Sequence, residues 1–211
     1  MPAMNPSARY DGLSQFLHWA IVLLVLVLLV MGKVGLVDAE HPESAAFMWH
    51  GSLGVLVLVL VAARAIWRLR RPPPEFPSTM TRLGRIGARM MHASLYVLLI
   101  ALPLSGWLAA SSEGSNVNFF NVATLPRWGG SVTADRGSAA APRTRAIAQS
   151  AEGREDLAEE AHELLGDALI ILASLHVLAA LKHQFIDHDD LIRRMLPAVW
   201  PRTPGTRSTG G

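Results

Sequence analysis

Hydrophobic and polar positions alternate along this chain in long blocks, and four of the blocks are apolar. Each apolar block has about the 20 residues that a helix needs to cross a hydrocarbon core about 30 Å thick. The pattern predicts an all-α, integral membrane four-helix bundle in a single domain of residues 1–200. We expect its helices at about residues 14–37, 47–69, 87–110 and 159–185.

The segments outside these helices show no such pattern. Residues 111–158 are rich in Gly, Ala and Ser and have no sustained period, which is typical of flexible loops. We expect a flexible loop there with at most a short helical piece near Ala146–Ala151, and a disordered tail over residues 201–211. The first apolar block is longer than a signal-peptide core and lacks a clear cleavage motif, so we expect it to remain as a helix.

Charge placement predicts how the helices are oriented. Arginines follow the second apolar block and return near the end of the chain, whereas the segment between the first two blocks has one lysine against three acidic residues. Cytoplasmic segments of membrane proteins carry the excess of Lys and Arg. Both termini should therefore be cytoplasmic. We expect membrane lipid to contact the apolar helices, and we expect no nucleic-acid partner.

Of the residues, 17% are charged and 51% are hydrophobic, and the chain contains no cysteine. Its absence excludes disulfides, iron–sulfur clusters, thiolate metal sites and covalent attachment of c-type haem. Any haem in this protein would therefore be b-type, held by coordination and packing.

Histidines occur near the ends of the apolar blocks. His162 and His176 are fourteen residues apart, which on a helix is about 21 Å along the axis and some 40° short of four turns, so both lie on one face. His50 should lie at the depth of His162, near the periplasmic side. His176 should meet His18 or His92 near the cytoplasmic side.

Two histidines that face each other across a bundle can bind both axial positions of a haem iron, which suits electron transfer. Incidental interfacial histidines, a proton path or a zinc site are alternatives, although zinc would need three or four ligands at one depth. Arg64 and Arg68, at the cytoplasmic end of the second helix, could bind haem propionates or serve only as positive anchors.

Four motifs resemble, in order, those of the bacterial cytochrome b561 family, whose members are four-helix, di-haem b proteins of the inner membrane. They are "LHWAIVLL", "MWHGSLGVLVLVLVAARAIWRL", "HASLYVLLIALPLSGW" and "HELLGDALIILASLHVLAALKH". The resemblance implies that His18 and His176 hold a cytoplasmic haem and that His50 and His162 hold a periplasmic one. His92 is then the alternative ligand, and His183 matches a residue expected beside quinone.

The resulting hypothesis is a multi-pass inner-membrane protein with two haems b that carries electrons from an outer-face donor to membrane quinone. The resemblance suggests superoxide as the donor, and hence an oxidoreductase that couples superoxide to quinone. A periplasmic redox partner is the other donor that we consider. The alternative function is a cytochrome b anchor subunit that relays electrons for a separate dehydrogenase or hydrogenase.

Overall fold

The computed structural model describes residues 9–37, 41–76, 80–112, 115–128, 142–188 and 191–196, without the side chains of residues 142–156. Its helices are α1 (Gly12–Lys33), α2 (Ala45–Arg70), α3 (Arg82–Ser112), α4 (Pro142–Phe185) and α5 (Leu191–Met195), and its strands are β1 (Asn118–Phe119) and β2 (Ala123–Thr124). Within the described residues, α1, α2, α3 and the Leu157–Phe185 part of α4 are long and apolar enough to cross a membrane. The predicted membrane four-helix bundle is therefore confirmed.

Helices α1, α2 and α3 begin earlier than the apolar pattern predicts, because a side chain just before the first turn caps each of them. Asp11 accepts a hydrogen bond from the Ser14 amide at 3.0 Å, and Ser44 accepts one from the Phe47 amide at 3.2 Å. Helix α3 is capped in the same way by Thr81, whose side chain accepts a hydrogen bond from the Gly84 amide. Such caps satisfy amides that have no partner within the helix.

The end of α1 also differs from the prediction. The helix ends at Lys33 rather than at residue 37, because Gly35 takes a left-handed conformation with φ +69°. The Leu36 amide then donates to the Met31 carbonyl at 3.1 Å. This is the Schellman arrangement, in which glycine turns the chain out of the helix at low steric cost.

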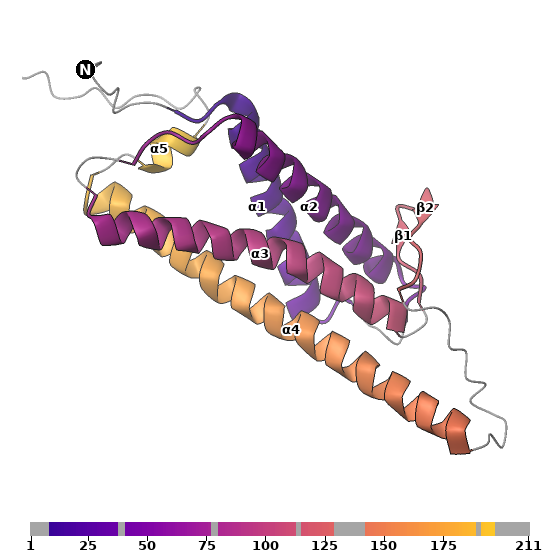
Figure 1. Cartoon of the computed structure of the whole chain (residues 1–211). Coiled ribbons are helices and arrows are strands. Elements are labelled where there is room, and N and C mark those ends of the chain that lie inside the picture. Colours follow the sequence, from indigo (N-terminus) through magenta and orange to yellow (C-terminus); the bar gives the residue numbers. More distant parts are fainter. Residues whose placement is uncertain are drawn as a thin grey trace, which may run out of the picture.

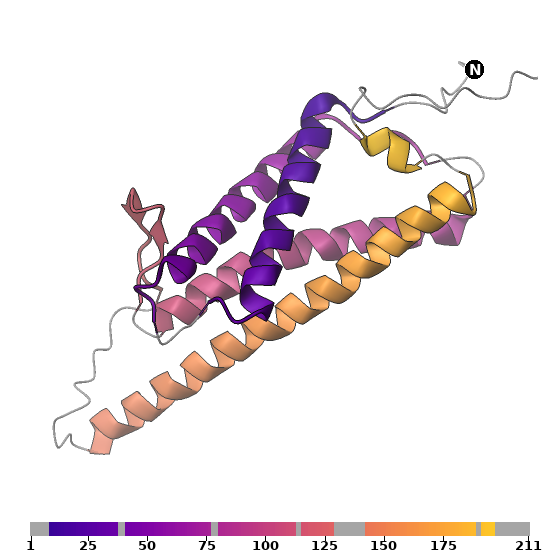
Figure 2. The ribbon, with the colours of Figure 1, turned by 180° about the vertical axis from the view of Figure 1, so that it is seen from behind.

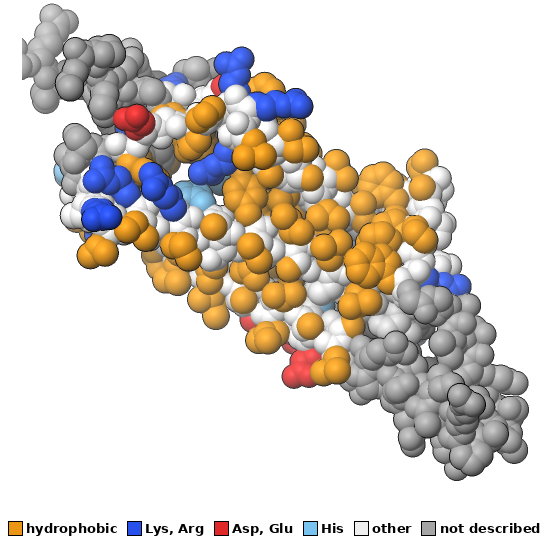
Figure 3. Space-filling view, in the orientation of Figure 1, with side chains coloured by type: hydrophobic (Ala, Val, Ile, Leu, Met, Phe, Trp, Pro, Cys, Tyr) orange, Lys and Arg blue, Asp and Glu red, His pale blue; other side chains and the backbone are white. Residues whose placement is uncertain are grey.

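The four spanning helices pack as α1 on α2, α2 on α3 and α3 on α4 (Figure 1). The buried cluster consists of Ile21 from α1 and Val57 and Val61 from α2, with Tyr96 and Leu99 of α3 packed against it. Most other apolar side chains of the helices point outward, as the orange surface of Figure 3 shows. An apolar exterior of this kind is stable in lipid, where the backbone polar groups are satisfied inside each helix.

The two ends of the bundle differ in composition. We call the end with β1 and β2 the hairpin end and the end with Arg64, Arg68 and Arg194 the arginine end. At the arginine end, the Tyr10 amide donates to the Arg194 carbonyl at 3.1 Å. Trp19 Nε1 donates to the Met195 carbonyl at 2.9 Å. These bonds hold α5 against the start of α1.

Helix α4 begins at Pro142 instead of near residue 159 and has 44 residues, a length of about 66 Å. That is about twice the hydrocarbon thickness, so α4 continues past the other helices at the hairpin end (Figures 1 and 2). Residues 142–158 lack an apolar face, but Ala, Arg, Glu and Gln dominate them and favour helix by their intrinsic propensity. The predicted short piece at Ala146–Ala151 is part of this helix, and the segment between residues 129 and 141 lies outside the described residues, as does the predicted tail.

The first part of the predicted flexible loop instead forms a packed hairpin at the end of α2. Phe120 and Asn121 have φ of 47° and 56°, as the central residues of a type I′ turn require. The hydroxyl of Ser52, which is 0% exposed, donates to the Asn118 carbonyl at 2.8 Å and accepts from the Phe120 amide at 2.9 Å. A strand of two residues is too short to show an alternation of polar and apolar residues, so the sequence does not reveal this hairpin.

Ser52→Ala should therefore loosen the hairpin without unfolding the bundle. It removes both bonds and leaves a carbonyl and an amide without their partner, at a cost of about 1–3 kcal/mol. Hydrogen–deuterium exchange of residues 118–124 in detergent should become faster. Ser112→Ala is the matched control, because among the described residues that hydroxyl bonds to carbonyls of its own helix. Equal exchange in both variants would contradict the anchoring role.

Candidate functional site

Two histidines face each other near the hairpin end, His50 from α2 and His162 from α4. Their ring centroids are 6.2 Å apart and the rings are inclined by 76°. Metal–imidazole bonds are about 2 Å long and each ring centroid lies roughly 1 Å behind its nitrogen, so two imidazoles on opposite sides of one metal ion have centroids about 6 Å apart. The separation of His50 and His162 therefore fits one shared ion.

The ring of His162 is oriented by α3. Its Nδ1 lies 3.1 Å from the Leu102 carbonyl and 3.0 Å from Ser105 Oγ. Because a carbonyl only accepts, Nδ1 carries the proton and donates it, which leaves the Nε2 lone pair for a metal. Gly106 makes room for the ring, since a Cβ at that position would lie 2.8 Å from His162 Cε1.

A cavity of about 450 Å³ surrounds the His50–His162 pair, within the range of roughly 300–1,000 Å³ for small-molecule sites. Its walls are mostly apolar, and a Cβ on Gly54 or Gly166 would meet nothing within 4 Å. His50 Nδ1 is buried and has no hydrogen-bond partner among the described residues. An apolar cavity between two imidazoles fits a flat, mostly apolar metal-centred macrocycle, and the predicted haem b therefore fits the residues present.

Charged side chains close the same cavity toward the hairpin end. Glu159, Glu163 and Lys33 line it. Lys33 Nζ lies 2.6 Å from Asp167 Oδ1 and 3.7 Å from Glu163 Oε1. This contact joins the end of α1 to α4, where the two helices meet in Figure 2. The sequence interpretation missed it, because charges at helix ends are usually solvated anchors.

Three histidines come together nearer the arginine end. His92 of α3 and His176 of α4 have ring centroids 5.2 Å apart, inclined by 75°. His92 Nδ1 lies 2.6 Å from the Ala88 carbonyl, so Nε2 is again the free nitrogen. His18 of α1 packs beside Trp19 and interacts electrostatically with both of the other histidines. The structure thus brings His176 together with both predicted partners, His18 and His92.

The two predicted propionate ligands lie beside this group. Arg64 interacts electrostatically with His18 and donates from Nη1 to the Ser14 carbonyl at 2.6 Å. The guanidinium of Arg68 lies 5.9 Å from the ring centroid of Tyr96, whose buried hydroxyl has no partner among the described residues. Burial raises the pKa of Tyr10, which lines a small cavity with both arginines. A carboxylate here would meet two guanidinium groups and the phenol of Tyr10, which suits charge-assisted binding.

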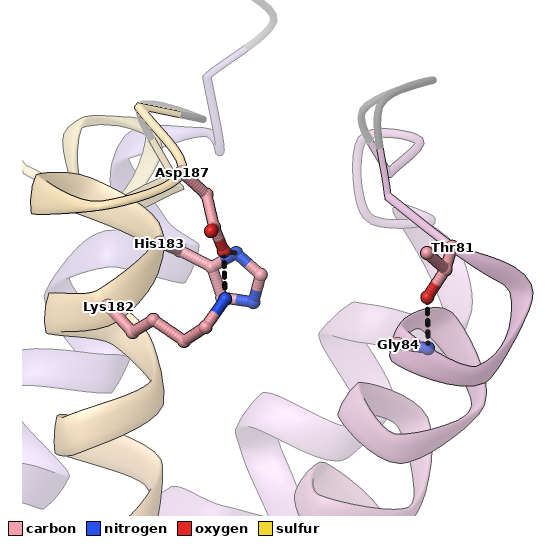
Figure 4. Close-up of polar contacts among 5 residues, drawn as sticks. All are labelled: Thr81, Gly84, Lys182, His183 and Asp187. Carbon is pink, nitrogen blue, oxygen red and sulfur yellow. Dashed lines mark hydrogen bonds and ion pairs between the residues drawn. The ribbon is translucent and has the colours of Figure 1, made fainter.

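His183 lies at the end of α4, beyond His176. Its Nδ1 is 3.0 Å from Asp187 Oδ2, and Lys182 Nζ is 2.5 Å from the same oxygen (Figure 4). The hydrogen bond from Lys182 lowers the pKa of Asp187, so that side chain remains a carboxylate. Figure 4 also shows the start of α3, where Thr81 Oγ1 accepts from the Gly84 amide at 3.1 Å. Asp187 was not predicted, although its i, i+4 spacing from His183 was a usable signal.

Comparison with known proteins agrees with the predicted fold class. The family model described as prokaryotic cytochrome b561 matches residues 9–198. Cytochrome b561 homolog 2 of Escherichia coli (strain K12) is 28% identical over 200 residues, which are 93% of this chain and 95% of that protein. The probable superoxide oxidase CybB of Yersinia pestis is 27% identical over 193 residues, 90% of this chain and 96% of that protein. Cytochrome b562 of Cereibacter sphaeroides is 26% identical over 199 residues, 92% and 98% of the two chains.

Gly106→Ala should disturb the hairpin-end site directly. The added methyl group would collide with the His162 ring, and overpacking of this kind costs about 1–3 kcal/mol. Thermal unfolding in detergent should show the loss. The matched control is Gly87→Ala on the same helix, where the Cβ meets nothing within 4 Å. That substitution should leave the stability of the protein unchanged or raise it by roughly 0.5–1 kcal/mol. Similar destabilisation by both variants would refute the close fit at Gly106.

Proposed function

This chain belongs to the prokaryotic cytochrome b561 family, and from that premise we propose that it binds two haems b and carries electrons through the membrane to quinone. Family membership and the four spanning helices make it a multi-pass electron-transfer protein of the bacterial inner membrane. The family also implies haem b as its cofactor. The number of haems, the donor and the acceptor are part of the proposal.

The observation that carries the proposal is the His50–His162 pair, with centroids 6.2 Å apart across an apolar cavity. Haem iron with two histidine ligands exchanges single electrons and has no open position for substrate. We assign these two histidines to one haem. The Leu102 carbonyl fixes the ring of His162, and Gly106 leaves space for it.

For the second haem we propose His176 with His18, and Arg64 and Arg68 as the groups that hold its propionates. The family resemblance supports His18, whereas the ring contact at 5.2 Å favours His92. His92 is therefore retained as the alternative ligand. In either case His162 and His176, on one helix, place the two haems at different depths about 21 Å apart along the axis.

We propose that the hairpin end faces the periplasm and the arginine end, with both termini, faces the cytoplasm. The positive-inside rule supports this, because Arg70 and Arg71 end α2 at the arginine end and Arg85 and Arg89 follow in the first turns of α3. Electrons would then enter at the His50–His162 haem. The name of the Yersinia relative, a probable superoxide oxidase, suggests superoxide as the donor.

Quinone reduction is assigned to the arginine end, with His183 beside the head group. The chemistry balances when two superoxide ions each give one electron and become O₂, while one quinone takes two electrons and two protons and becomes quinol. Asp187 accepts from His183 Nδ1 and so directs the opposite ring nitrogen away from the carboxylate. An imidazole held in this way can donate a hydrogen bond to a quinone carbonyl and pass a proton to it.

The alternative function is an anchor subunit that relays electrons for a separate dehydrogenase or hydrogenase. The feature that favours it is α4, which begins 15 residues before its spanning part and would offer a docking element. Stopped-flow mixing of the isolated, haem-loaded chain with superoxide and quinone separates the two functions. Rapid haem reduction followed by quinol formation supports the oxidoreductase, and no reduction by superoxide supports the relay subunit.

The haem assignment predicts distinct losses in single variants. The wild-type chain should contain about two low-spin haems by pyridine haemochrome assay, and His162→Ala and His18→Ala should each retain about one. The two variants should lose different haems, as visible difference spectra would show. His92→Ala should retain both. Loss of a haem in His92→Ala together with full occupancy in His18→Ala would instead make His92 the ligand.

The quinone assignment predicts a variant with normal haems and slow turnover. His183→Ala should keep both haems but reduce quinone roughly 100-fold more slowly and require more quinone, because a positioned acid–base group typically contributes 10²- to 10⁴-fold. His188→Ala is the control, since that histidine follows Asp187 outside α4. Unchanged quinone kinetics in His183→Ala would exclude the role.

A further inference from the structure

The two proposed haem sites lie in surroundings of opposite charge. At the hairpin end, Glu159 and Glu163 line the cavity that holds His162, and Asp167 lies one turn further along α4. One cation, Lys33, lines the same cavity, and it is shared between Glu163 and Asp167. Among the described residues that line this cavity or pair with them, carboxylates therefore outnumber cations.

The sequence of the connecting segments does not reverse this balance. Residues 113–156, which connect α3 to the spanning part of α4, contain five acidic and five basic residues. The segment between α1 and α2 adds Asp38, Glu40 and Glu43. The hairpin end thus carries net negative charge in the sequence as well as around the cavity.

The arginine end has the opposite charge. Arg64 and Arg68 both interact electrostatically with His92, and Arg71 lines the same small cavity as these two arginines. Asp11, a described carboxylate at this end, is exposed and accepts hydrogen bonds from Ser14 and from Trp67 Nε1. Blue side chains gather at this end in Figure 3.

These charges act on haem reduction in opposite directions. Reduction adds one electron to the iron, so nearby carboxylates disfavour it and nearby guanidinium groups favour it. The effect is strong where low-dielectric helices separate the charges from water and weaker where the side chains are exposed. Glu163 and Asp167 are largely exposed, with 73% and 54% of their side-chain surface accessible, so salt should screen part of their effect.

We propose that Glu159, Glu163 and Asp167 hold the hairpin-end haem at a lower reduction potential than the arginine-end haem, with Lys33 limiting the difference. This inference rests on the proposed two-haem function. Electron transfer from the hairpin end to the arginine end is then thermodynamically downhill. The direction of electron flow follows from fixed charges on α1, α2 and α4, whichever donor delivers the electron.

Glu163 and Glu160 provide a matched pair for the test. Both are exposed glutamates on α4 and lie within two residues of His162, but Glu163 lines the cavity and Glu160 does not. Neutralising either one changes the net charge of the protein equally. Any difference in reduction potential between the two variants therefore reflects the position of the glutamate relative to the haem and not the total charge of the protein.

The experiment is a spectroelectrochemical redox titration of the haem-loaded full chain. The wild type should show two transitions, and the one at lower potential should be missing in His162→Ala. Glu163→Gln should move the lower transition to higher potential and leave the upper one in place, whereas Glu160→Gln should move neither. Lys33→Gln should move the lower transition further down, and Arg68→Gln should lower the upper one. High salt should bring the two wild-type transitions closer together.

Two results would overturn the inference while the proposed function stands. One is a preparation with two haems in which His162→Ala removes the transition at higher potential. The other is an equal displacement of the lower transition by Glu163→Gln and Glu160→Gln. A fully loaded wild type with only one haem per chain by pyridine haemochrome would instead reject the proposed function and this inference with it.

Discussion

The apolar interior of the bundle is the constraint on which the rest of this structure depends. A polar nitrogen placed between apolar helices must find a partner, because neither lipid nor hydrocarbon side chains can provide one. His92 and His162 each donate one ring proton to a backbone carbonyl of α3, which leaves the other nitrogen pointing into the bundle. Helix α3, which provides both carbonyls, therefore determines which ring nitrogen each of these histidines would offer to a metal.

Helix α4 joins the proposed functions along one line. It carries His162, His176 and His183 in order, and its length places the first near one side of the membrane and the last near the other. Because a helix is rigid over this distance, the proposed haem ligands and the proposed quinone residue have fixed spacings. The other helices contribute the second ligand at each depth and close the cavity around it.

The charges that orient the protein also fit its proposed chemistry. Arginines at one end of the bundle support the proposed cytoplasmic position of that end, because cytoplasmic segments carry the excess of Lys and Arg. The same arginines lie beside His18 and His92, where they would favour an added electron. The carboxylates around Lys33 lie at the other end. One asymmetry in the sequence would thus serve both the proposed orientation in the membrane and the proposed direction of electron transfer.

The sequence by itself determined the spanning helices and the depths of the histidines. Apolar runs of about 20 residues have few alternatives to a membrane helix, and the periodicity of the helix then fixes which side chains share a face. The absence of cysteine also excluded covalently attached haem, and the family resemblance then implied haem b. The sequence predicted the helix ends less accurately, because the caps at Asp11 and Ser44 extend α1 and α2 beyond the apolar pattern.

Only the tertiary structure decided which groups meet across helices. The structure brings both His18 and His92 within reach of His176. Spacing along single helices cannot show that three histidines from three helices meet. The anchoring of the hairpin by Ser52, the contact of Lys33 with Asp167 and the space at Gly106 for His162 join segments far apart in the chain. Such contacts depend on the relative rotation and crossing of the helices. These are set by side-chain packing across the whole bundle, and no local pattern of hydrophobic and polar residues encodes them.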